Sequence, residues 1–453
     1  MSHYTICISN IAPDSNNKVI RWCLDVPQNQ FVVSADELSE TGLLLKGWVL
    51  TDNLPSTQLV VSSGSAIAPL PIEKERPDVV NKLINDDSDK ARFLKCGFRT
   101  VFTPETDFFQ IGLLENEKFR PLIDITIKGA LDVLKGSDKW LFLDNDSNQS
   151  VEQFTGKLKL TRIQLKQWKL YFSTLEKLGA HSSVHYSMLI APSKEMVYPE
   201  YYPLKRAKTL PSDKVMSSVP YGVTVSIPIE QLKSAPYRTY RVCDTHWNHL
   251  GAFEASLVTA SLHNKNIEDL RSYFAKDKYK VRMVGGDLGN KLFPIQKHNE
   301  KFLTSFKYKD YVVFDNRLPN FGRVIVIYYP DALYDEVLLL LGSSSSYTMF
   351  NYLSRIYRKV VFFHCAGNID PDFVKKITPD YVVAQTNARF VIKPPVASDN
   401  FLSYIKRKVT PAANRKTAFI DKNVLQHRKD KKLLDILSYL KELNQKAKIE
   451  FNC

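Results

Sequence analysis

The spacing of apolar residues changes character near Gly129. Before that point, short apolar runs alternate with turn residues such as Gly42 and Pro104, a pattern typical of strands joined by short connections. Residues 19–125 are therefore predicted to be β-rich, and short strands at this spacing favour a β-sandwich. Residues 76–79 and 90–94 are expected in connections or a short helix. The expected strands are residues 31–33, 43–50, 58–61, 98–102 and 108–114.

After Gly129, buried strand-like runs alternate with stretches of helical periodicity. Residues 160–178 carry apolar side chains at helical spacing, and Gly179 is a plausible stop. This alternation favours a three-layer α/β/α domain with a mainly parallel sheet. The expected strands are 139–143, 184–190, 324–329, 337–341, 360–363 and 381–384, and the other expected helices are 251–262, 347–357 and 373–377.

The composition shifts again after Pro395, where the chain becomes rich in lysine. Residues 431–446 carry an apolar stripe and are predicted to form an amphipathic helix, which packs on a protein body more often than on a membrane. The sequence thus predicts a β-sandwich domain over residues 1–125, an α/β domain over 126–400 and a basic helical extension over 401–453.

Composition narrows the class of protein. Hydrophobic residues make up 44% and charged residues 24% of the 453, which excludes disorder along the whole chain. No apolar run approaches the roughly 20 residues of a membrane helix, and the first ten residues lack the pattern of a secretory signal. A cytoplasmic location is expected, with a peripheral position at the inner membrane as its variant. The six cysteines lie far apart without zinc-ligand spacing, so reduced thiols and no metal are expected.

The net charge of +14 favours anionic partners such as anionic lipid and phosphorylated or nucleotide-linked sugars. Much of the excess lies toward the C-terminal end and need not describe an active site. Nucleic acid is not the expected partner, and docking of the basic tail to an anionic membrane surface is an open alternative.

Asp244 and His246 form the first candidate for catalysis, in a segment that leads into a predicted helix. A carboxylate two residues before a histidine can accept the Nδ1–H of the imidazole and leave Nε2 to take a proton. The alternative is a helix cap, because Asp, Thr and Asn all cap helices well. His249 is a second candidate base, without a carboxylate at short range.

The second candidate is the run from Gly342 through four serines, between an apolar strand and a predicted helix. A serine at such a turn is exposed at the carboxyl edge of a parallel sheet, and backbone N–H groups at the helix start can hold an oxyanion. The alternative is a serine-rich turn with a serine N-cap. The run is not a phosphate-binding P-loop, because the Gly-Lys-Ser/Thr ending is missing.

Polar residues also follow two other predicted strands. Lys194 and Tyr198 come after strand 184–190, where they either line a cleft or are simply exposed to solvent on a loop. Gln385, Asn387 and Arg389 come after strand 381–384 and reach the same sheet edge, although polar residues there are often inert. Residues 285–289 lack dinucleotide-binding spacing and are interpreted as a turn.

Taken in order, these segments resemble a known family. Residues 128–395 are similar to the SGNH-hydrolase-like domain of alginate O-acetyltransferases and related polysaccharide O-acetyltransferases. The most specific stretch is Asp244-Thr-His-Trp247 with Gly251-Ala252. The other matching stretches are Lys139-Trp-Leu-Phe-Leu143 with Asp146, Ala191-Pro-Ser-Lys-Glu-Met-Val-Tyr198, Gly285-Gly-Asp-Leu-Gly289, Gly342-Ser-Ser344 and Pro379-Asp-Tyr-Val-Val383 through Arg389.

The resemblance implies a role for individual residues. Ser344 would be the nucleophile, His246 the base and Asp244 the group that orients it. Ser343 stands where the family usually has Asp or Thr, so the register among the four serines stays open. The implied substrate-binding residues are Arg389, Lys194, Tyr198 and Trp247. No bound cofactor is implied, and the acetyl donor is acetyl-CoA or another acyl carrier.

Residues 19–125 resemble a β-sandwich module found with bacterial surface-polysaccharide glycosyltransferases, which implies binding of a carbohydrate or a partner. Trp48 either stacks on a sugar or belongs to the core. The matching stretches are Asp25-Val-Pro27, Leu45-Lys-Gly-Trp-Val-Leu50, Arg76-Pro-Asp-Val79 and Cys96-Gly-Phe98.

Together, the resemblances imply O-acetylation of a bacterial surface (capsule-type) polysaccharide or its lipid- or nucleotide-linked precursor through a Ser-His-Asp acyl-enzyme. Glycosyltransferases or polysaccharide-assembly proteins are the implied protein partners. Two alternatives are a carbohydrate esterase with the same triad and a non-catalytic glycan-binding protein.

Overall fold

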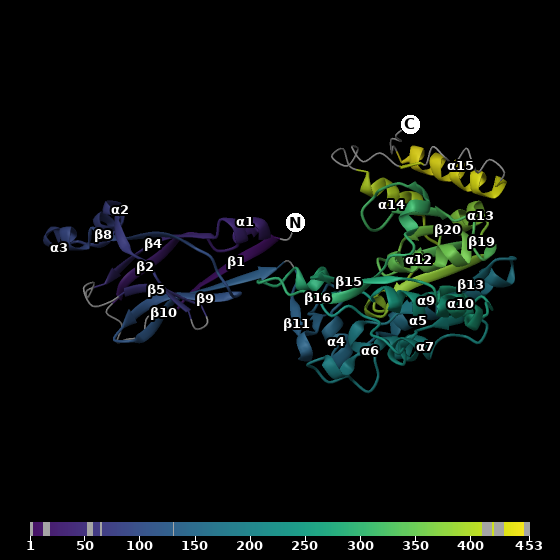
Figure 1. Cartoon of the computed structure of the whole chain (residues 1–453), viewed down its shortest axis with the longest axis horizontal. Coiled ribbons are helices and arrows are strands. Elements are labelled where there is room, and N and C mark those ends of the chain that lie inside the picture. The colour runs from purple at the N-terminus through teal and green to yellow at the C-terminus, as the bar shows by residue number, and fades with distance from the viewer. Residues whose placement is uncertain are drawn as a thin grey trace. The chain divides into compact units, whose positions relative to one another are not determined.

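The computed structural model describes residues 3–11, 19–51, 58–63, 66–129, 131–409, 419–420 and 430–447. The chain forms two compact units. The first comprises Met1–Val133 and Gly285–Lys297, and the second comprises Leu134–Val284 and His298–Cys453. Figure 1 shows the elements of both units in sequence colours.

The first unit is built from two antiparallel sheets. The larger has the strand order β3-β1-β10-β9-β5-β6 and the smaller has the order β2-β4-β8-β7. The strands are β1 (His3–Asn10), β2 (Val19–Val26), β3 (Phe31–Ser34), β4 (Leu43–Thr51), β5 (Gln58–Ser63), β6 (Ala66–Pro69), β7 (Ile72–Glu75), β8 (Lys95–Phe102), β9 (Phe108–Glu115) and β10 (Lys118–Gly129).

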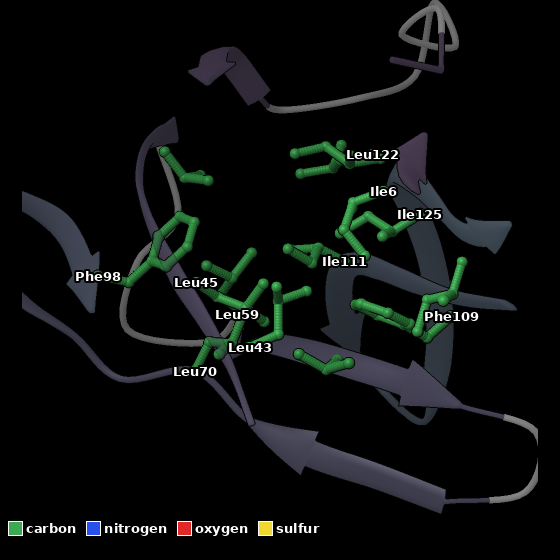
Figure 2. Close-up of a cluster of buried hydrophobic side chains, with 14 of the residues drawn as sticks. Ile6, Leu43, Leu45, Leu59, Leu70, Phe98, Phe109, Ile111, Leu122 and Ile125 are labelled. Carbon is green, nitrogen blue, oxygen red and sulfur yellow. The ribbon is translucent and has the colours of Figure 1, made fainter. Parts of the chain in front are cut away.

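One hydrophobic core joins the two sheets. Alternate side chains of a strand point to opposite faces, so Ile6 and Ile111 from the larger sheet meet Leu45 and Phe98 from the smaller one (Figure 2). Full burial of each such side chain contributes roughly 1.5–3 kcal/mol. Gly47 lies where the strands approach closely, because a Cβ there would be 2.3 Å from the carbonyl oxygen of Cys23 on β2.

Short helices connect the strands of the first unit. Helices α2 (Pro77–Leu83) and α3 (Asp87–Phe93) occupy the stretches where a connection or short helix is expected. Helix α1 (Ala35–Glu40) follows β3. Trp48 packs, partly buried, on a small cluster that includes Leu50 and Phe93, so much of its indole serves packing.

Residues 285–297 belong to the first unit although they lie far along the chain. Tyr4 donates its hydroxyl hydrogen bond to the carbonyl of Leu292 at 3.0 Å, and the ring of Phe293 packs edge-on against Tyr4. Helix α11 (Gly286–Gly289) lies within the stretch that the sequence analysis interprets as a turn. Such long-range contacts carry no local sequence signal.

The second unit contains a mixed eight-stranded sheet with the order β14-β13-β21-β19-β20-β18-β17-β22. Neighbours from β14 to β20 pair in parallel, and β18, β17 and β22 continue the sheet in antiparallel fashion. The strands are β13 (His185–Ala191), β14 (Thr224–Ser226), β17 (Val312–Asp315), β18 (Val324–Tyr328), β19 (Tyr334–Gly342), β20 (Tyr357–His364), β21 (Tyr381–Asn387) and β22 (Phe419–Ile420).

The parallel strands are covered by helices. Helix α5 (Arg162–Ala180) packs on β13, and helix α12 (Ser346–Ile356) packs on β20 and on helix α9 (His249–Ser261). Residues 338–341 of β19 are fully buried, as expected for a strand with both faces covered. Helix α5 continues one residue past Gly179, the predicted stop.

The remaining elements of the second unit are short. The strand expected over residues 139–143 is restricted to β12, because residues 137–139 form a 3₁₀ turn. The small strands are β11 (Val133–Lys135), β12 (Leu141–Leu143), β15 (Tyr279–Val284) and β16 (His298–Leu303). The other helices are α4 (Ser150–Thr155), α6 (Lys194–Val197), α7 (Pro211–Met216), α8 (Ile229–Lys233), α10 (Ile267–Phe274), α13 (Pro371–Ile377), α14 (Phe401–Lys408) and α15 (Lys431–Lys446).

Helices α14 and α15, in the segment where the sequence predicts a basic helical extension, group with the second unit. The apolar stripe of α15, including Leu433, Ile436 and Leu440, is buried, and the helix packs on α13 and α14. The first unit extends to Val133 in the structure, whereas the sequence predicts a domain end at residue 125. The difference arises because β10 continues to Gly129. Among the described residues, no helix has the length and apolar character needed to cross a membrane, and no disulfide is formed.

Candidate active site

The predicted catalytic residues lie at the carboxyl ends of parallel strands in the second unit. Ser344 follows β19 after one intervening residue, Ser343, and Asn387 is the last residue of β21. Asp244 and His246 lie in the segment before α9, whose N-terminus is capped by the Asn248 side chain. This is the sheet edge at which open α/β folds place their sites.

His246 lies between Asp244 and Ser344. Its Nδ1 is 2.8 Å from Asp244 Oδ1, and its Nε2 is 2.9 Å from Ser344 Oγ. The backbone N–H of His246 also donates to Asp244 Oδ1 at 2.9 Å. The hydrogen-bond order expected from the sequence is therefore present, and it allows Nε2 to accept the proton of the serine hydroxyl.

Asp244 is held as a carboxylate. Burial would raise its pKa, but the hydrogen bonds and charge of His246, together with the charge of Arg241, outweigh burial and lower the pKa of Asp244. Arg241 Nη1 lies 3.2 Å from Asp244 Oδ2. An ionised Asp244 accepts the Nδ1–H of His246 and stabilises the imidazolium that forms when His246 takes a proton.

Each of the other serines in the turn donates to an amide oxygen of β21. The hydroxyls of Ser343 and Ser346 both donate to Gln385 Oε1 at 2.9 Å. The hydroxyl of Ser345 donates to Asn387 Oδ1 at 3.0 Å.

These contacts resolve the register that the sequence leaves open. Of the four serines, Ser344 is the one whose hydroxyl meets His246. The sequence draws attention to Gln385 and Asn387 only through their position after a predicted strand. The pairing of polar residues from one strand end with a turn from another could not be recognised from local sequence.

Lys194, for which the resemblance implies a substrate-binding role, is hydrogen-bonded to the segment that carries Asp244. Its side chain is buried, with 3% of the residue exposed. Its ammonium donates to the carbonyls of Arg241, Val242 and Asp244 at 3.1, 3.0 and 2.8 Å. Lys194 thus holds the loop that carries Asp244.

Tyr198 is hydrogen-bonded to the segment that precedes Asp244. Its hydroxyl oxygen accepts the backbone N–H of Thr239 at 2.8 Å and lies 3.0 Å from the hydroxyl of that residue. Trp247 is buried, and its indole N–H donates to the carbonyl of Ser345 at 3.0 Å. Trp247 therefore links the histidine segment to the serine turn.

A cavity of about 20 Å³ adjoins His246, which is room for about one water molecule. Arg389 borders it, with 22% of its side chain exposed and its Nε 3.5 Å from Asp146 Oδ2. Of the four predicted substrate-binding residues, Arg389 and Trp247 line this cavity, whereas Lys194 and Tyr198 do not. The lining residues are Pro192, Ser193, Tyr240, Thr245, His246, Trp247, Ser345, Asn387 and Arg389.

His249, the second candidate base, makes no hydrogen bond to the serine turn in the described part of the chain. Its Nδ1 is buried without a hydrogen-bond partner there. Burial, aided by the charge of Arg241, lowers the pKa of His249 to about 4. The geometry therefore favours His246 over His249 as the base.

Comparison with known proteins found distant structural similarity. No protein-family model and no curated protein matches the chain. Bacillus cereus PatB1 is 13% identical over 60% of this chain and 99% of its own, with a TM-score of 0.44. The O-acetyltransferase domain of Pseudomonas putida AlgJ is 16% identical over 59% and 94%, with a TM-score of 0.37. Pseudomonas aeruginosa AlgX is 11% identical over 58% and 66%, with a TM-score of 0.32. Similarity this distant assigns neither a family nor a reaction.

Proposed function

We propose that this chain is an O-acetyltransferase that forms an acyl-enzyme on Ser344 and passes the acetyl group to a sugar hydroxyl. The observation that carries the proposal is the position of His246, hydrogen-bonded to Ser344 Oγ on one side and to Asp244 on the other. The acetyl group and the sugar acceptor come from the resemblance to polysaccharide O-acetyltransferases, as does a three-layer SGNH-like architecture.

In the first half of the reaction, Ser344 Oγ attacks the carbonyl carbon of an acetyl donor while His246 Nε2 takes its proton. A bond forms between Oγ and the carbonyl carbon, and the carbonyl oxygen becomes an oxyanion. His246 then returns the proton to the leaving group as the bond to the donor breaks. Acetyl-CoA or another acyl carrier is the proposed donor.

Two N–H groups are available for the oxyanion. The backbone N–H of Ser344 and the side-chain amide N–H of Asn387 have no hydrogen-bond partner among the described residues, and Asn387 borders the cavity beside His246. Preorganised donors of this kind stabilise the charge that develops in the transition state, by about 3–4 kcal/mol for one donor. We therefore assign Asn387 as an oxyanion donor.

In the second half, His246 Nε2 takes the proton of a sugar hydroxyl, and the sugar oxygen bonds to the acetyl carbon. The bond between that carbon and Ser344 Oγ then breaks, and His246 returns the proton to Oγ. Arg389 borders the cavity and is the proposed contact for the acceptor. Hydrolysis competes unless the acceptor is positioned and water is excluded. A cytoplasmic location, glycosyltransferase partners and docking of the basic tail to an anionic membrane remain predictions.

The proposal is tested by trapping the nucleophile and by following the acetyl group. A fluorophosphonate probe should add one phosphonyl group to the wild type, located at Ser344 by peptide mass spectrometry. The Ser344→Ala variant should lose both the adduct and acetyl transfer, whereas Ser261→Ala, at an exposed serine of α9, should retain both.

The same assay separates the alternatives. Acetyl transfer from a labelled donor to an oligosaccharide supports the proposal. Release of acetate from an acetylated glycan without any transfer would assign an esterase. Turnover that persists in Ser344→Ala would refute Ser344 as the nucleophile. A wild type that shows neither turnover nor the adduct would favour a non-catalytic glycan-binding protein.

A further inference from the structure

The side-chain amide of Asn387 offers an N–H to the cavity in only one of its two orientations. An amide rotated by 180° would present its oxygen there and repel an oxyanion. The contacts of Gln385 decide which orientation is adopted.

Gln385 has a fixed orientation of its own. It is fully buried, and its Oε1 accepts the backbone N–H of Ser343 at 2.8 Å. A backbone N–H can only donate, so the atom facing Ser343 must be the oxygen. The hydroxyl of Ser346 donates to the same oxygen at 2.9 Å.

The other end of the Gln385 amide then fixes Asn387. Gln385 Nε2 donates to the carbonyl of Thr386 at 2.7 Å and to Asn387 Oδ1 at 3.2 Å. The hydroxyl of Ser345 donates to the same Oδ1 at 3.0 Å. With Oδ1 held by these donors, Nδ2 is the amide atom left to face the cavity that Asn387 borders. Rotating Asn387 would place its Nδ2 against Gln385 Nε2, with two donors facing each other.

We propose that Gln385 is a positioning residue, which transmits the fixed direction of a backbone N–H in the serine turn to the amide of Asn387. The inference rests on the proposed function of Ser344 and of the oxyanion donor. Gln385 does not itself line the cavity, and its hydrogen bond to a lining residue is the one to Asn387, so it acts through Asn387.

Gly342 is needed for this contact. A Cβ at that position would lie 2.2 Å from Ser346 Oγ and 3.2 Å from Gln385 Oε1. A larger residue would displace the Ser346 hydroxyl that donates to Gln385 Oε1. The glycine that ends β19 is therefore part of the same arrangement.

The test is the nearly isosteric substitution Gln385→Glu. The carboxylate still accepts from Ser343 and Ser346, but it replaces the donor to Asn387 Oδ1 by an acceptor and favours rotation of the Asn387 amide. We expect kcat for Ser344-dependent acetyl release to fall by roughly 10- to 100-fold, with KM changed less than about 2-fold, because an oxyanion donor acts in the transition state.

A double-mutant cycle separates positioning from general damage. In an Asn387→Ala background the same Gln385→Glu change should cost less than about 3-fold, because the amide that it misorients is already absent. A loss of equal size in both backgrounds would overturn the proposal, and so would unchanged kcat in the single variant.

Asn316→Asp is the matched control for burying a carboxylate. Asn316 is a fully buried amide whose Oδ1 accepts the N–H of Val324 and whose Nδ2 donates to the carbonyl of Gly322. We expect it to lower the melting temperature without lowering kcat at a temperature where the variant stays folded. A kcat loss in Asn316→Asp matching that of Gln385→Glu would also overturn the proposal.

If Gln385→Glu does not fold, Gln385→Met is the second variant. It removes the donor to Asn387 without adding charge, and it also removes the acceptor of Ser343 and Ser346, so its effect is compared only through its coupling to Asn387→Ala. The reference measurement is wild type against Ser344→Ala. If wild-type turnover does not depend on Ser344, the proposed function fails, and the assignment of Gln385 fails with it. If turnover depends on Ser344 but Gln385 and Asn387 show no coupling, the positioning role alone is refuted.

Discussion

Replacing Asp244 by asparagine should remove most of the activity while leaving the shape of the site intact. Asp244 Oδ1 accepts the backbone N–H of His246 at 2.9 Å and faces its Nδ1 at 2.8 Å, and Oδ2 faces Arg241 at 3.2 Å. An amide fits the same space. Either orientation of the amide places its N–H₂ against a donor, on one side Arg241 and on the other the backbone N–H of His246. An N–H₂ on the His246 side also makes Nδ1 an acceptor, and one on the Arg241 side leaves the imidazolium without a facing negative charge.

The orientation with the N–H₂ on the His246 side explains the size of the expected loss. If Nδ1 accepts, the imidazole proton lies on Nε2 and points at Ser344 Oγ, so His246 cannot take the serine proton. The corresponding change in a catalytic triad lowers kcat by about 10⁴-fold, which corresponds to about 5 kcal/mol of transition-state stabilisation. We expect a loss of roughly 10³- to 10⁴-fold here.

The assay is acetate release from p-nitrophenyl acetate, with the rate of fluorophosphonate labelling as a second reading. Asp213→Asn is the matched control, because Asp213 also accepts a backbone N–H, from Leu210, and pairs with Arg206. That variant should retain activity. A loss of less than about 10-fold in a folded Asp244→Asn protein would refute the proposed role of the carboxylate.

Three further predictions follow from other contacts in the second unit. Lys194→Met should lower activity, because the three carbonyls bound by Lys194 Nζ lose their donor and fewer molecules keep the Asp244 loop intact. Backbone hydrogen exchange across residues 241–246 should become faster, and unchanged exchange would contradict this prediction. Leu440→Ala should reduce the free energy of unfolding in urea titrations by about 2–5 kcal/mol, because Leu440 of α15 is fully buried. A change below about 0.5 kcal/mol would contradict the packing of α15 on α13 and α14. Burial, with the charges of His185 and Lys265, lowers the pKa of His263 to about 3. The contribution of neutral His263 to the free energy of unfolding is therefore complete above the unfolded pKa of about 6.5 and is lost progressively as the pH falls toward 3. His263→Gln should flatten the pH dependence of the free energy of unfolding between pH 7 and 4, and an unchanged slope would argue against that burial.

Much of the second unit was predictable because its strands are buried on both faces. The apolar run at residues 337–341 lies within β19, and the alternation with helices gave the parallel part of the sheet. The antiparallel strands at one edge were harder to anticipate, because edge pairing depends on contacts between distant segments. β22, for example, joins β17 from more than a hundred residues along the chain.

A site residue was predictable where its hydrogen-bond partner lies close to it in the sequence. Asp244 and His246 are two residues apart, so the carboxylate and the imidazole could be paired from sequence spacing. The burial of Lys194 was not predictable, because a lysine after a strand is usually exposed. Three backbone carbonyls from another segment made its burial possible here, and no pattern in the sequence marks backbone acceptors.

The four serines show why a repeated residue can carry different roles. A run of identical hydroxyls gives no local reason to choose a nucleophile, and the selection comes from partners on two other segments. Two amide oxygens of β21 accept from Ser343, Ser345 and Ser346, and a hydroxyl has a single proton to donate. The position left for His246 is Ser344. The proposed nucleophile is therefore defined as much by what holds its neighbours as by the histidine that it meets, which makes Gln385 and Asn387 as informative to mutate as the proposed triad.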